Sequence, residues 1–266
     1  MDLQLKGKRA LVTGGSRGIG LACARQLARE GCAVMLAARD AEALKTAAAS
    51  VAEETGAQVI WRVVDTASDT SVKAMARAAS SQLGGVDILV NAAAKVAGQS
   101  APPKLAEITD ELFWDDVNVK VMGYLRCARE VAPLMMAQGW GRIVNISGLA
   151  ARQTGSAIGS IRNVGVAALT KNLADELGPH GINATCVHPG LTVTEKTAPL
   201  VASRAATSGK TPEEIEKVMA SSTILGRLVT AEEVADVVTF LASPRSVSIN
   251  GDAIAVGGGV RGPIYY

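Results

Sequence analysis

Histidine and cysteine are scarce in this sequence, and their scarcity limits the metal chemistry available to the protein. The 266 residues include only two histidines and four cysteines. The cysteines lie far apart, without the paired spacing of a zinc-binding motif, and two histidines cannot complete a conventional zinc cluster. We therefore expect no metal site, and we expect the cysteines to be buried free thiols.

An excess of charge of one sign and a long apolar run are also absent. The 27 basic and 25 acidic residues are scattered along the chain and give a formal net charge of +2. Such a balance provides no concentrated field for nucleic acid or an anionic membrane. The N-terminal stretch MDLQLKGKRALVTGG has too short an apolar run for a secretory core or a bilayer span. We therefore expect a cytoplasmic protein that binds neither nucleic acid nor membrane.

What the chain does contain is a regular alternation of apolar runs and segments with helical periodicity. RALVTG precedes GIGLACARQLAREG, AVMLAAR precedes AEALKTAAASVAEETG, and the alternation continues to TAEEVADVVTFLAS and DAIAVGG. This order predicts parallel strands joined by crossover helices, and strands rich in Val, Ile, Leu and Ala are typical of a sheet covered on both faces. With 48% apolar residues, the chain can bury one large core. We predict a single α/β domain, residues 1–266, with a doubly wound parallel sheet in three αβα layers.

The segment from Leu191 to Leu225 interrupts this alternation. It is rich in Ser, Thr, Ala and Lys and is too long for an ordinary connection between a strand and a helix. Ligands of doubly wound sheets bind at the carboxyl ends of the strands, and this segment follows such an end. We therefore predict a mobile lid over a small-molecule substrate, whose identity the side chains of the lid do not reveal.

The stretch TGGSRGIG, residues 13–20, follows the first predicted strand and opens the first predicted helix. Gly14 permits a tight turn, Gly18 lets the backbone approach a pyrophosphate, and Gly20 allows close packing of the helix. The amino end of the helix favours the anion. This pattern predicts a dinucleotide-binding site.

The end of the second predicted strand indicates which dinucleotide binds. An acidic residue there would bind the adenosine ribose diol, but the position is held by Ala38. Arg39 follows it and Arg17 lies in the glycine stretch, so two guanidinium groups can hold a 2′-phosphate. The sequence therefore favours NADP(H) over NAD(H), with two ordinary surface charges as the alternative.

These and further motifs resemble the short-chain dehydrogenase/reductase family, which has a Rossmann-type fold, over nearly the whole chain. Asp65 matches the adenine-contacting aspartate of the family, NAAA from Asn91 resembles its NNAG stretch, and Asn118 in VNVK matches its helix asparagine. HPGLTVT resembles the segment that closes over the nicotinamide, with Thr194 at the carboxamide contact. The resemblance implies a set of cofactor-binding residues: Gly14, Ser16, Arg17, Gly18, Ile19, Gly20, Arg39, Asp65, Asn91, Asn163, Pro189, Gly190, Thr192 and Thr194.

The resemblance also implies a departure at the catalytic helix. In the family, a tyrosine exchanges a proton with the substrate, and a lysine four residues later lowers its pKa and holds the cofactor ribose, because positions i and i+4 share a helix face. Alignment back from LTKNLADELGPHGI puts Gly159 at the tyrosine position and Asn163 at the lysine position. The tyrosines of the chain, Tyr124, Tyr265 and Tyr266, lie outside that helix. The sequence thus predicts a site without the catalytic phenol and ammonium.

Other residues remain candidates for catalysis. The resemblance implies roles for Asn118 and for Ser147, although the loop from Ser147 to Gly159 is shorter than usual. His188 precedes Pro-Gly near the expected nicotinamide and titrates near neutrality, so it is a candidate proton donor. Arg162 could orient a carboxylate substrate. The alternative for each is a purely structural role.

Two more candidates come from the end of the sequence. In the family, C-terminal residues can reach the active site of a neighbouring subunit, so Tyr265 or Tyr266 could supply a phenol there. The helices expected around Trp114 to Gln138 and from Val164 to Leu177 resemble those through which family members associate. The resemblance therefore implies a homodimer or homotetramer.

Three functions are compatible with these residues. The first is an NADP(H)-dependent oxidoreductase that acts on a small carbonyl or alcohol with a non-standard proton donor. The second is a catalytically silent NADP-binding protein, and the third is a lyase or epimerase that keeps the nucleotide as a scaffold. The resemblance to the family places the oxidoreductase first.

Overall fold

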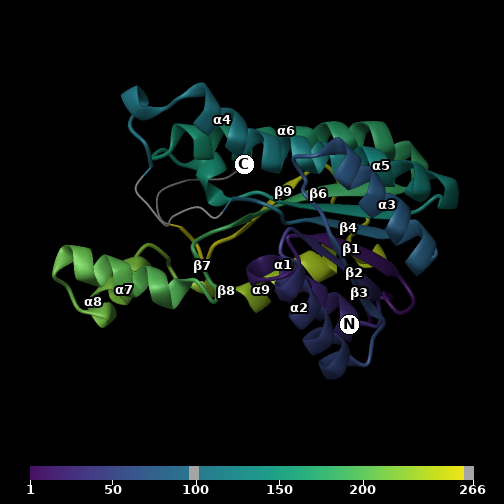
Figure 1. Ribbon diagram of the computed structural model, residues 1–266, viewed down its shortest axis with the longest axis horizontal. Coiled ribbons are helices and arrows are strands. Elements are labelled where there is room, and N and C mark those ends of the chain that lie inside the picture. Colours follow the sequence, from purple (N-terminus) through teal and green to yellow (C-terminus); the bar gives the residue numbers. More distant parts are fainter. Residues whose placement is uncertain (96–101, 261–266) are drawn as a thin grey trace.

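The protein is organised around one parallel β-sheet, and the computed structural model describes residues 1–95 and 102–260. The seven strands of the sheet, in spatial order, are β3 (Val59–Val63), β2 (Ala33–Ala38), β1 (Arg9–Thr13), β4 (Ile88–Asn91), β5 (Gly141–Ile146), β6 (Ile182–Pro189) and β9 (Ala253–Val256) (Figure 1). Every neighbouring pair in this sheet is parallel. The strand order reverses between β1 and β4, which is where such sheets bind ligands at their carboxyl edge.

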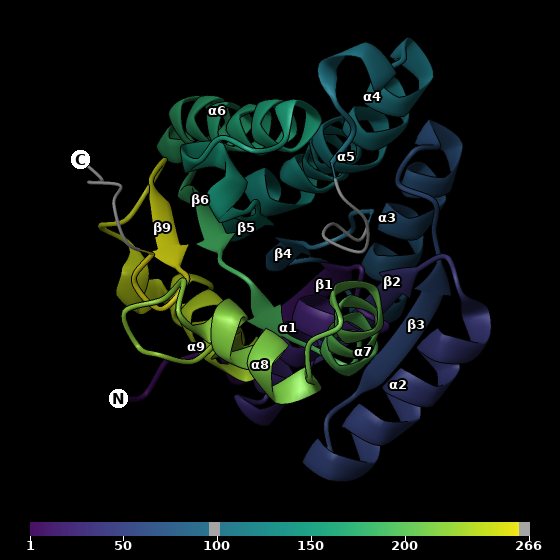
Figure 2. The same cartoon turned by 90° about the vertical axis from the view of Figure 1, so that its left-hand side faces the viewer.

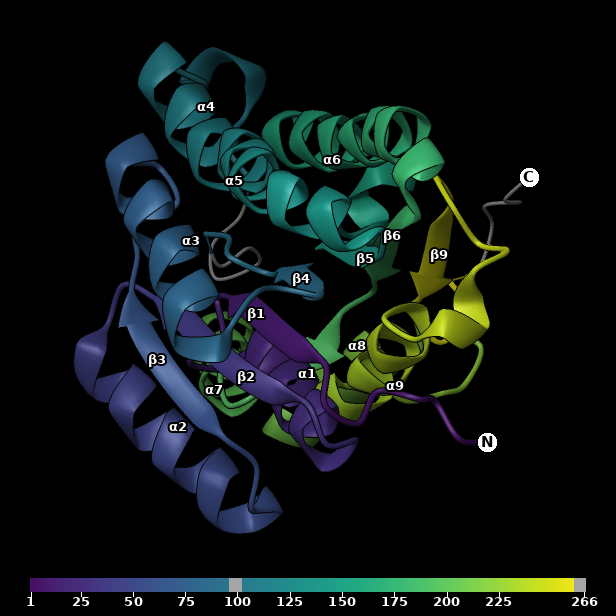
Figure 3. The same cartoon turned by 90° about the vertical axis from the view of Figure 1, so that its right-hand side faces the viewer.

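Helices cover both faces of the sheet. One face carries α1 (Gly18–Arg29), α2 (Ala41–Thr55) and α9 (Ala231–Leu241), and the other carries α3 (Asp69–Leu83), α5 (Gly123–Gln138) and α6 (Ala157–Leu177) (Figures 2 and 3). These layers confirm the predicted doubly wound α/β architecture. The central strands β1, β2 and β4 are mostly apolar and buried because helices cover both of their faces, whereas the edge strand β3 is partly exposed.

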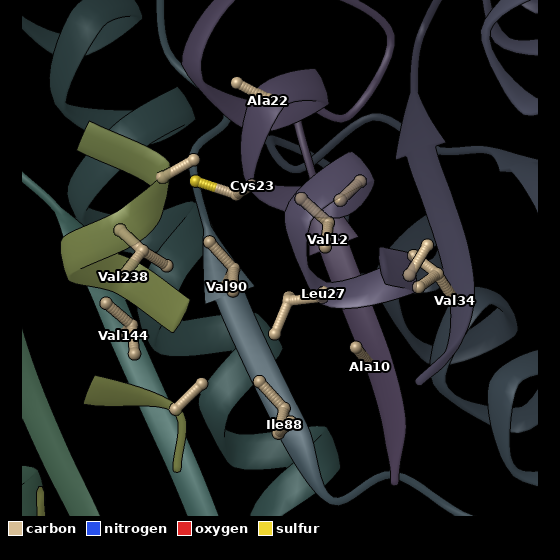
Figure 4. Packing of buried hydrophobic residues seen from close by; sticks show 14 of the residues in the cluster. Ala10, Val12, Ala22, Cys23, Leu27, Val34, Ile88, Val90, Val144 and Val238 are labelled. Carbon is tan, nitrogen blue, oxygen red and sulfur yellow. The ribbon is translucent and has the colours of Figure 1, made fainter. Parts of the chain in front are cut away.

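The core between α1, α9 and the sheet is built from small and branched side chains. Leu27 of α1 and Val238 of α9 lie against Ile88, Val90 and Val144 of the sheet, and all five are fully buried (Figure 4). Most other core positions of α1 are alanine, which lets the helix backbone approach the sheet closely. This close seating fixes the amino end of α1 beside the ends of β1 and β4.

The cysteines are part of these cores. Cys23, Cys32, Cys127 and Cys186 are buried and free, as predicted. Burial raises the pKa of Cys23, Cys32 and Cys127 to about 12 and that of Cys186 to about 11. They are therefore protonated and act as small apolar side chains.

The helix expected around Trp114 to Gln138 is divided into three parts. A helix α4 (Asp110–Val117) is followed by a π-helical turn, η2 (Asn118–Met122), and then by α5. Turns of this kind insert one residue into the helical repeat and are common at functional sites. Here the turn includes Lys120, which is only 4% exposed. Short 3₁₀ turns complete the connections: η1 (Leu105–Glu107), η3 (Leu149–Arg152), η4 (Gly178–His180) and η5 (Pro244–Ser246).

The predicted lid segment is folded, and it projects from the body at the carboxyl edge of the sheet (Figure 1). It contains β7 (Thr192–Val193), α7 (Thr197–Ser208) and α8 (Pro212–Ala220), and β7 pairs in parallel with β8 (Val229–Thr230). Residues of α7 and α8 form a small core of their own. No helix within residues 1–95 and 102–260 combines the length and apolar character needed to cross a membrane.

One ion pair joins β1 to β4 at the amino edge of the sheet. The Arg9 guanidinium donates to both carboxylate oxygens of Asp87 at 2.7 and 2.8 Å, and the Arg9 backbone N–H donates at 2.8 Å. Burial alone would raise the pKa of Asp87, but these hydrogen bonds and the charge of Arg9 outweigh it and hold the pKa below its usual value. The charged carboxylate therefore stabilises the fold.

We predict that Asp87→Asn lowers the free energy of unfolding by about 1–3 kcal/mol, because Arg9 loses its charged partner in a part-buried place. In the unchanged protein, the contribution is present above about pH 4, the usual aspartate pKa, and is lost as the pH falls through the lowered pKa of the folded state. Urea titrations at neutral and acidic pH measure both effects.

The matched control is Glu54→Gln, which breaks the exposed pairs that this carboxylate forms with Arg25 and Arg29. Exposed pairs contribute little, so we expect almost no change in unfolding. Equal losses in the two variants would contradict a special role for Asp87.

Candidate active site

The glycine stretch brings the backbone of β1 unusually close to its neighbours. Gly14 has a φ of +68°, and a Cβ there would lie 2.7 Å from the carbonyl oxygen of Ala92. A Cβ on Gly20 would lie 2.3 Å from the carbonyl oxygen of Gly14. Side chains at these two positions would push α1 away from the sheet, so the glycines keep its amino end within reach of a ligand at the carboxyl edge.

An anionic group already occupies the amino end of α1. The backbone N–H of Gly18 donates to Oε2 of Glu195 at 3.2 Å, and Glu195 lies in the lid segment between β7 and α7. The carboxylate oxygens stand in for phosphate oxygens, since both accept from free N–H groups at a helix start. This contact fits the predicted pyrophosphate site, and it ties the lid to that site.

The groups expected around the adenosine 2′-phosphate are available. Arg17 and Arg39 are exposed, and neither side chain has a hydrogen bond or ion pair to another described residue. The acidic residue nearest to them in sequence, Asp40, caps α2 by accepting from the Ala43 N–H at 3.1 Å. Asp40 is thus engaged in its own helix, and the guanidinium of Arg39 is not paired with it.

Two further residues of the predicted nucleotide site lie at strand ends. Oδ1 of Asp65 accepts from the backbone N–H of Ala67 at 3.0 Å, and its other oxygen has no hydrogen bond to a described residue. Asn91 is buried at the end of β4 and donates to Oδ1 of Asn145 at 2.9 Å. Its own Oδ1 is buried without a hydrogen-bond partner in the described structure. Their predicted cofactor contacts stay predictions.

The segment after β6 turns toward the amino end of α1. Gly190 follows β6, and a Cβ there would lie 2.8 Å from the Cα of Gly257. The Thr192 hydroxyl donates to the Gly190 carbonyl at 3.0 Å. A methyl carbon of Thr194 lies 3.6 Å from the place where Gly18 would carry a Cβ. Thr194, at the end of the segment that the sequence assigns to the cofactor, therefore reaches the glycine stretch.

Three polar side chains from three elements meet between β5 and α6. Ser147 follows β5, Asn163 lies on α6, and Lys120 comes from the π-helical turn. Nζ of Lys120 donates to Oδ1 of Asn163 and to the carbonyl oxygen of Ser147, both at 2.9 Å. The Ser147 hydroxyl donates to the carbonyl oxygen of Asn163 at 2.9 Å and lies 3.3 Å from its Oδ1. We call Lys120, Ser147 and Asn163 the polar cluster.

Gly159 adjoins the polar cluster and shapes the start of α6. Nδ2 of Asn163 donates to the Gly159 carbonyl at 2.8 Å. The Gly159 N–H donates to the hydroxyl of Ser156, the residue that caps α6, at 3.0 Å. A Cβ on Gly159 would lie 2.8 Å from that hydroxyl oxygen, so a larger residue there requires Ser156 to turn.

Lys120 has an unusual electrostatic environment. Burial, helped by the nearby charge of Arg162, lowers its pKa to about 7, although Cys186 and Asp116 act in the opposite direction. The carboxylate of Asp116 on α4 forms an ion pair with the guanidinium of Arg162, so it stabilises the charge of Arg162 more than that of Lys120. Lys120 therefore stands near the balance between its charged and neutral forms at neutral pH.

Lys120 is not among the site residues predicted from the sequence. In a regular helix continuing from α4, its position gives no sign that it lies inside, and the π-helical turn that turns it inward has no sequence signature. The one available signal was a lysine in an otherwise apolar stretch, VNVKVMGYL. That signal is equally typical of a solvated helix face.

His188 is buried beside the polar cluster. Its Nδ1 accepts from the backbone N–H of Gly148 at 3.4 Å. Burial lowers its pKa to about 4, and the charges of Arg152 and Lys120 lower it as well. An imidazole with that pKa is neutral at pH 7 and has no extra proton to give. The structure thus supports a neutral hydrogen-bonding role for His188 better than the predicted role as proton donor.

The remaining candidates are placed as follows. Oδ1 of Asn118 accepts from the Arg126 guanidinium at 2.8 Å, so its side chain is already engaged. Tyr124 is fully buried and donates to the carbonyl of Ile146 at 3.0 Å, and burial raises its pKa well above the usual value. Tyr265 and Tyr266 lie outside the described residues. No phenol among the described residues is therefore placed to exchange protons with a ligand.

Known proteins match this chain over nearly its whole length. A family model described as enoyl-(acyl carrier protein) reductase matches residues 14–261. The short-chain reductase protein NovJ of Streptomyces niveus is 34% identical over 252 residues, or 94% of this chain and 92% of that protein. The 3-oxoacyl-(acyl-carrier-protein) reductase FabG of Aquifex aeolicus is 33% identical over 263 residues, or 98% of this chain and 100% of that protein.

Solved structures are similar over the same length. L-sorbose reductase from Gluconobacter frateurii, solved with NADPH and L-sorbose, has a TM-score of 0.92 at 31% identity and covers 99% of this chain and 100% of its own. A variant of the actinorhodin polyketide ketoreductase, solved with NADPH, has a TM-score of 0.87 at 32% identity and covers 94% and 96%. Both are NADPH-complexed reductases with the same sheet and helix layers.

The contact between Gly18 and Glu195 leads to a prediction for nucleotide binding. Glu195→Gln should tighten NADPH binding about threefold to tenfold, because the phosphate then no longer competes with a carboxylate for the start of α1. Isothermal titration calorimetry measures the change. Glu216→Gln, which removes an exposed charge on α8, is the control and should leave the affinity unchanged. Weaker binding by Glu195→Gln would show that the carboxylate assists the nucleotide instead.

Proposed function

The chain belongs to the short-chain dehydrogenase/reductase family, and on that basis we propose that it is an NADP(H)-dependent oxidoreductase that acts on a small carbonyl or alcohol. The observation that carries the proposal is the polar cluster beside the carboxyl edge of the sheet. It keeps a serine hydroxyl and an amine next to the place where the resemblance puts the catalytic helix. A silent nucleotide-binding protein would not need a buried amine there.

The residues of the nucleotide end fit a bound dinucleotide phosphate. The Gly18 N–H donates to a carboxylate at the amino end of α1, and two exposed guanidinium groups are available, Arg17 at the start of α1 and Arg39 after β2. NADPH, when bound, supplies a hydride for a carbonyl carbon. The role of the protein is then to orient the carbonyl, exclude water and supply a proton. We assign the orientation to the hydroxyl of Ser147, which donates to the Asn163 carbonyl in the structure and would turn toward a carbonyl oxygen of the substrate.

We propose that the proton donor of this site is not the family tyrosine. Gly159 has no side chain and Asn163 carries an amide, so neither performs the acid–base step of the phenol and ammonium. General acid–base catalysis typically contributes about a hundredfold to ten-thousandfold to the rate, whereas orientation of the reactants can contribute more. Reduction therefore remains possible here at a lower rate.

The substrate class follows from relatives and from the lid. Relatives include ketoacyl reductases and a sorbose reductase, which reduce ketones, and we propose a ketone for this chain as well. The segment from Leu191 to Leu225 exposes apolar side chains at Leu191, Val193, Ile224 and Leu225. We propose that these side chains close over an apolar part of the substrate when the lid moves.

To test turnover, purified protein is mixed with NADPH and a panel of β-ketoacyl thioesters, simple ketones and ketoses, and the absorbance of NADPH is followed. We expect slow oxidation with at least one ketone, and Ser147→Ala should reduce that rate about tenfold to a hundredfold by removing the hydroxyl that orients the carbonyl. Tight NADPH binding without turnover on any member of the panel would favour the catalytically silent alternative.

For the cofactor preference, we predict that Arg39→Ala weakens NADPH binding about tenfold and leaves NADH binding almost unchanged. The reason is that only NADPH carries the 2′-phosphate that a guanidinium can hold by charge-assisted hydrogen bonds. Calorimetry with both nucleotides measures the difference. Lys45→Ala, which removes an exposed charge further along α2, is the control. An equal loss for both nucleotides would show that Arg39 has no part in selecting NADP(H).

We also propose a homodimer or homotetramer, formed through α4 and α6, which lie on the same side of the molecule (Figure 2). Their exposed faces carry large apolar side chains: Trp114 is 61%, Ile161 53% and Val164 50% exposed. Isolated apolar residues are common on surfaces, but a group of this kind is typical of an interface. Size-exclusion chromatography with light scattering, on the native chain and on Val164→Glu, measures the association and its loss.

A further inference from the structure

Lys120 is the buried charged group that the proposed reaction leaves unexplained. Its Nζ is held only by neutral acceptors, the Asn163 amide oxygen and the Ser147 carbonyl, both at 2.9 Å. Burial of an ammonium without a carboxylate partner is unfavourable, and a methionine would fill the same space without that penalty. The nearest carboxylate, on Asp116, pairs with Arg162. The polar cluster therefore contains an amine that packing alone does not require.

The contact with Lys120 changes the chemistry of the Asn163 side chain. Oδ1 accepts from Nζ, and one Nδ2 hydrogen goes to the Gly159 carbonyl at 2.8 Å. An amide has a second Nδ2 hydrogen, and here it has no acceptor among the described residues. When its oxygen accepts a hydrogen bond from an ammonium, the amide is polarised and becomes a stronger N–H donor. Lys120 thus strengthens the remaining N–H donor of Asn163 by polarising its amide.

We propose that Lys120 is a positioning residue that polarises the Asn163 amide from behind, so that Nδ2 of Asn163 can bind a hydroxyl group of the nicotinamide ribose. The inference rests on the proposed function, because it takes an NADP(H) site for granted. It assigns to this site an ammonium that comes from the π-helical turn and not from α6. Asn163 contacts the cofactor, and Lys120 acts through it.

The charge state of Lys120 makes this role dependent on pH. The groups that face Lys120 are Arg162 of α6, Asp116 of α4, and Cys186 and His188 of β6. Burial and Arg162 together lower the pKa of Lys120 to about 7. The ammonium is therefore lost as the pH rises through neutrality, and the amide donor weakens with it. NADPH affinity should fall over the same range.

The first experiment examines the contact in the nucleotide-free protein. Lysine side chains labelled with ¹³C at Cε are titrated by NMR. We expect one resonance with a midpoint near neutrality, which is absent from Lys120→Met. In Asn163→Asp a new carboxylate lies against Nζ, so the midpoint should move up by at least about one pH unit. Surface lysines, which titrate near pH 10 in both proteins, are the internal control.

The outcomes of this titration are decisive without cofactor. A Lys120 midpoint near that of the surface lysines, or one that Asn163→Asp leaves in place, overturns the inference. If Lys120→Met does not fold, the resonance is assigned from Lys120→Arg, which removes the lysine signal and keeps the charge. The shift in Asn163→Asp then decides.

The second experiment measures NADPH binding by calorimetry from about pH 6 to about pH 9. We expect the native protein to lose about fivefold in affinity over this range, as a charge-assisted contact becomes a neutral one. Lys120→Arg, whose charge does not titrate, should show a flat profile at the tight level, and Lys120→Met a flat profile at the weak level. Lys171→Met, on the outer side of α6, is the matched control and should keep the native profile.

The two proposals fail in different ways. Absence of NADPH binding in every protein refutes the proposed function, while the nucleotide-free titration still decides the contact between Lys120 and Asn163. Normal NADPH binding with a profile that Lys120→Met leaves unchanged refutes the positioning role and leaves the proposed function standing.

Discussion

The site depends on the burial of one amine beside one amide. Lys120 and Asn163 come from different helices, and their contact holds the start of α6 against the π-helical turn and against the end of β5 through Ser147. Because the acceptors are neutral, the amine is not fixed in one charge state, and its burial and Arg162 set the balance. In the site that we propose, this arrangement would present an amide and a hydroxyl to the ligand.

At the amino end of α1, the charged group held by neutral partners is a carboxylate and not an amine. A helix start that is rigidly seated by alanine packing provides free N–H groups, and the nearest anion satisfies them, here Glu195 of the lid segment. A phosphate at this place has to displace the carboxylate, and Glu195 precedes α7 by two residues. We therefore expect nucleotide binding and the position of the lid to be linked through a single donor, the backbone N–H of Gly18. This expected link comes from the contact between Gly18 and Glu195, and not from the fold of the sheet or from Arg17 and Arg39.

Sequence reasoning recovered what repeats locally and missed what depends on distant contacts. The alternation of strands and helices, the close turn at Gly14 and the positive charge after β2 are all encoded within short segments, and the structure reproduces them. Lys120 points inward because a π-helical turn interrupts the helix. Glu195 contacts Gly18 although 177 residues separate them in the sequence. His188 was expected to titrate near neutrality, but burial and two neighbouring cations lower its pKa to about 4, which its sequence neighbours do not foretell.

The departures at the start of α6 are coupled to one another. A side chain at Gly159 would meet the Ser156 hydroxyl that caps the helix, at 2.8 Å from its Cβ. A lysine at Asn163 would bring a second ammonium against Nζ of Lys120, now 2.9 Å from the amide oxygen, and like charges so close in a buried place repel strongly. A tyrosine and a lysine at these two positions would therefore require Ser156 to turn and would place a second cation near Lys120. Gly159, Asn163 and Lys120 are therefore mutually compatible. Gly159 leaves the Ser156 cap undisturbed, and the neutral amide of Asn163 accepts a hydrogen bond from Lys120 without charge repulsion.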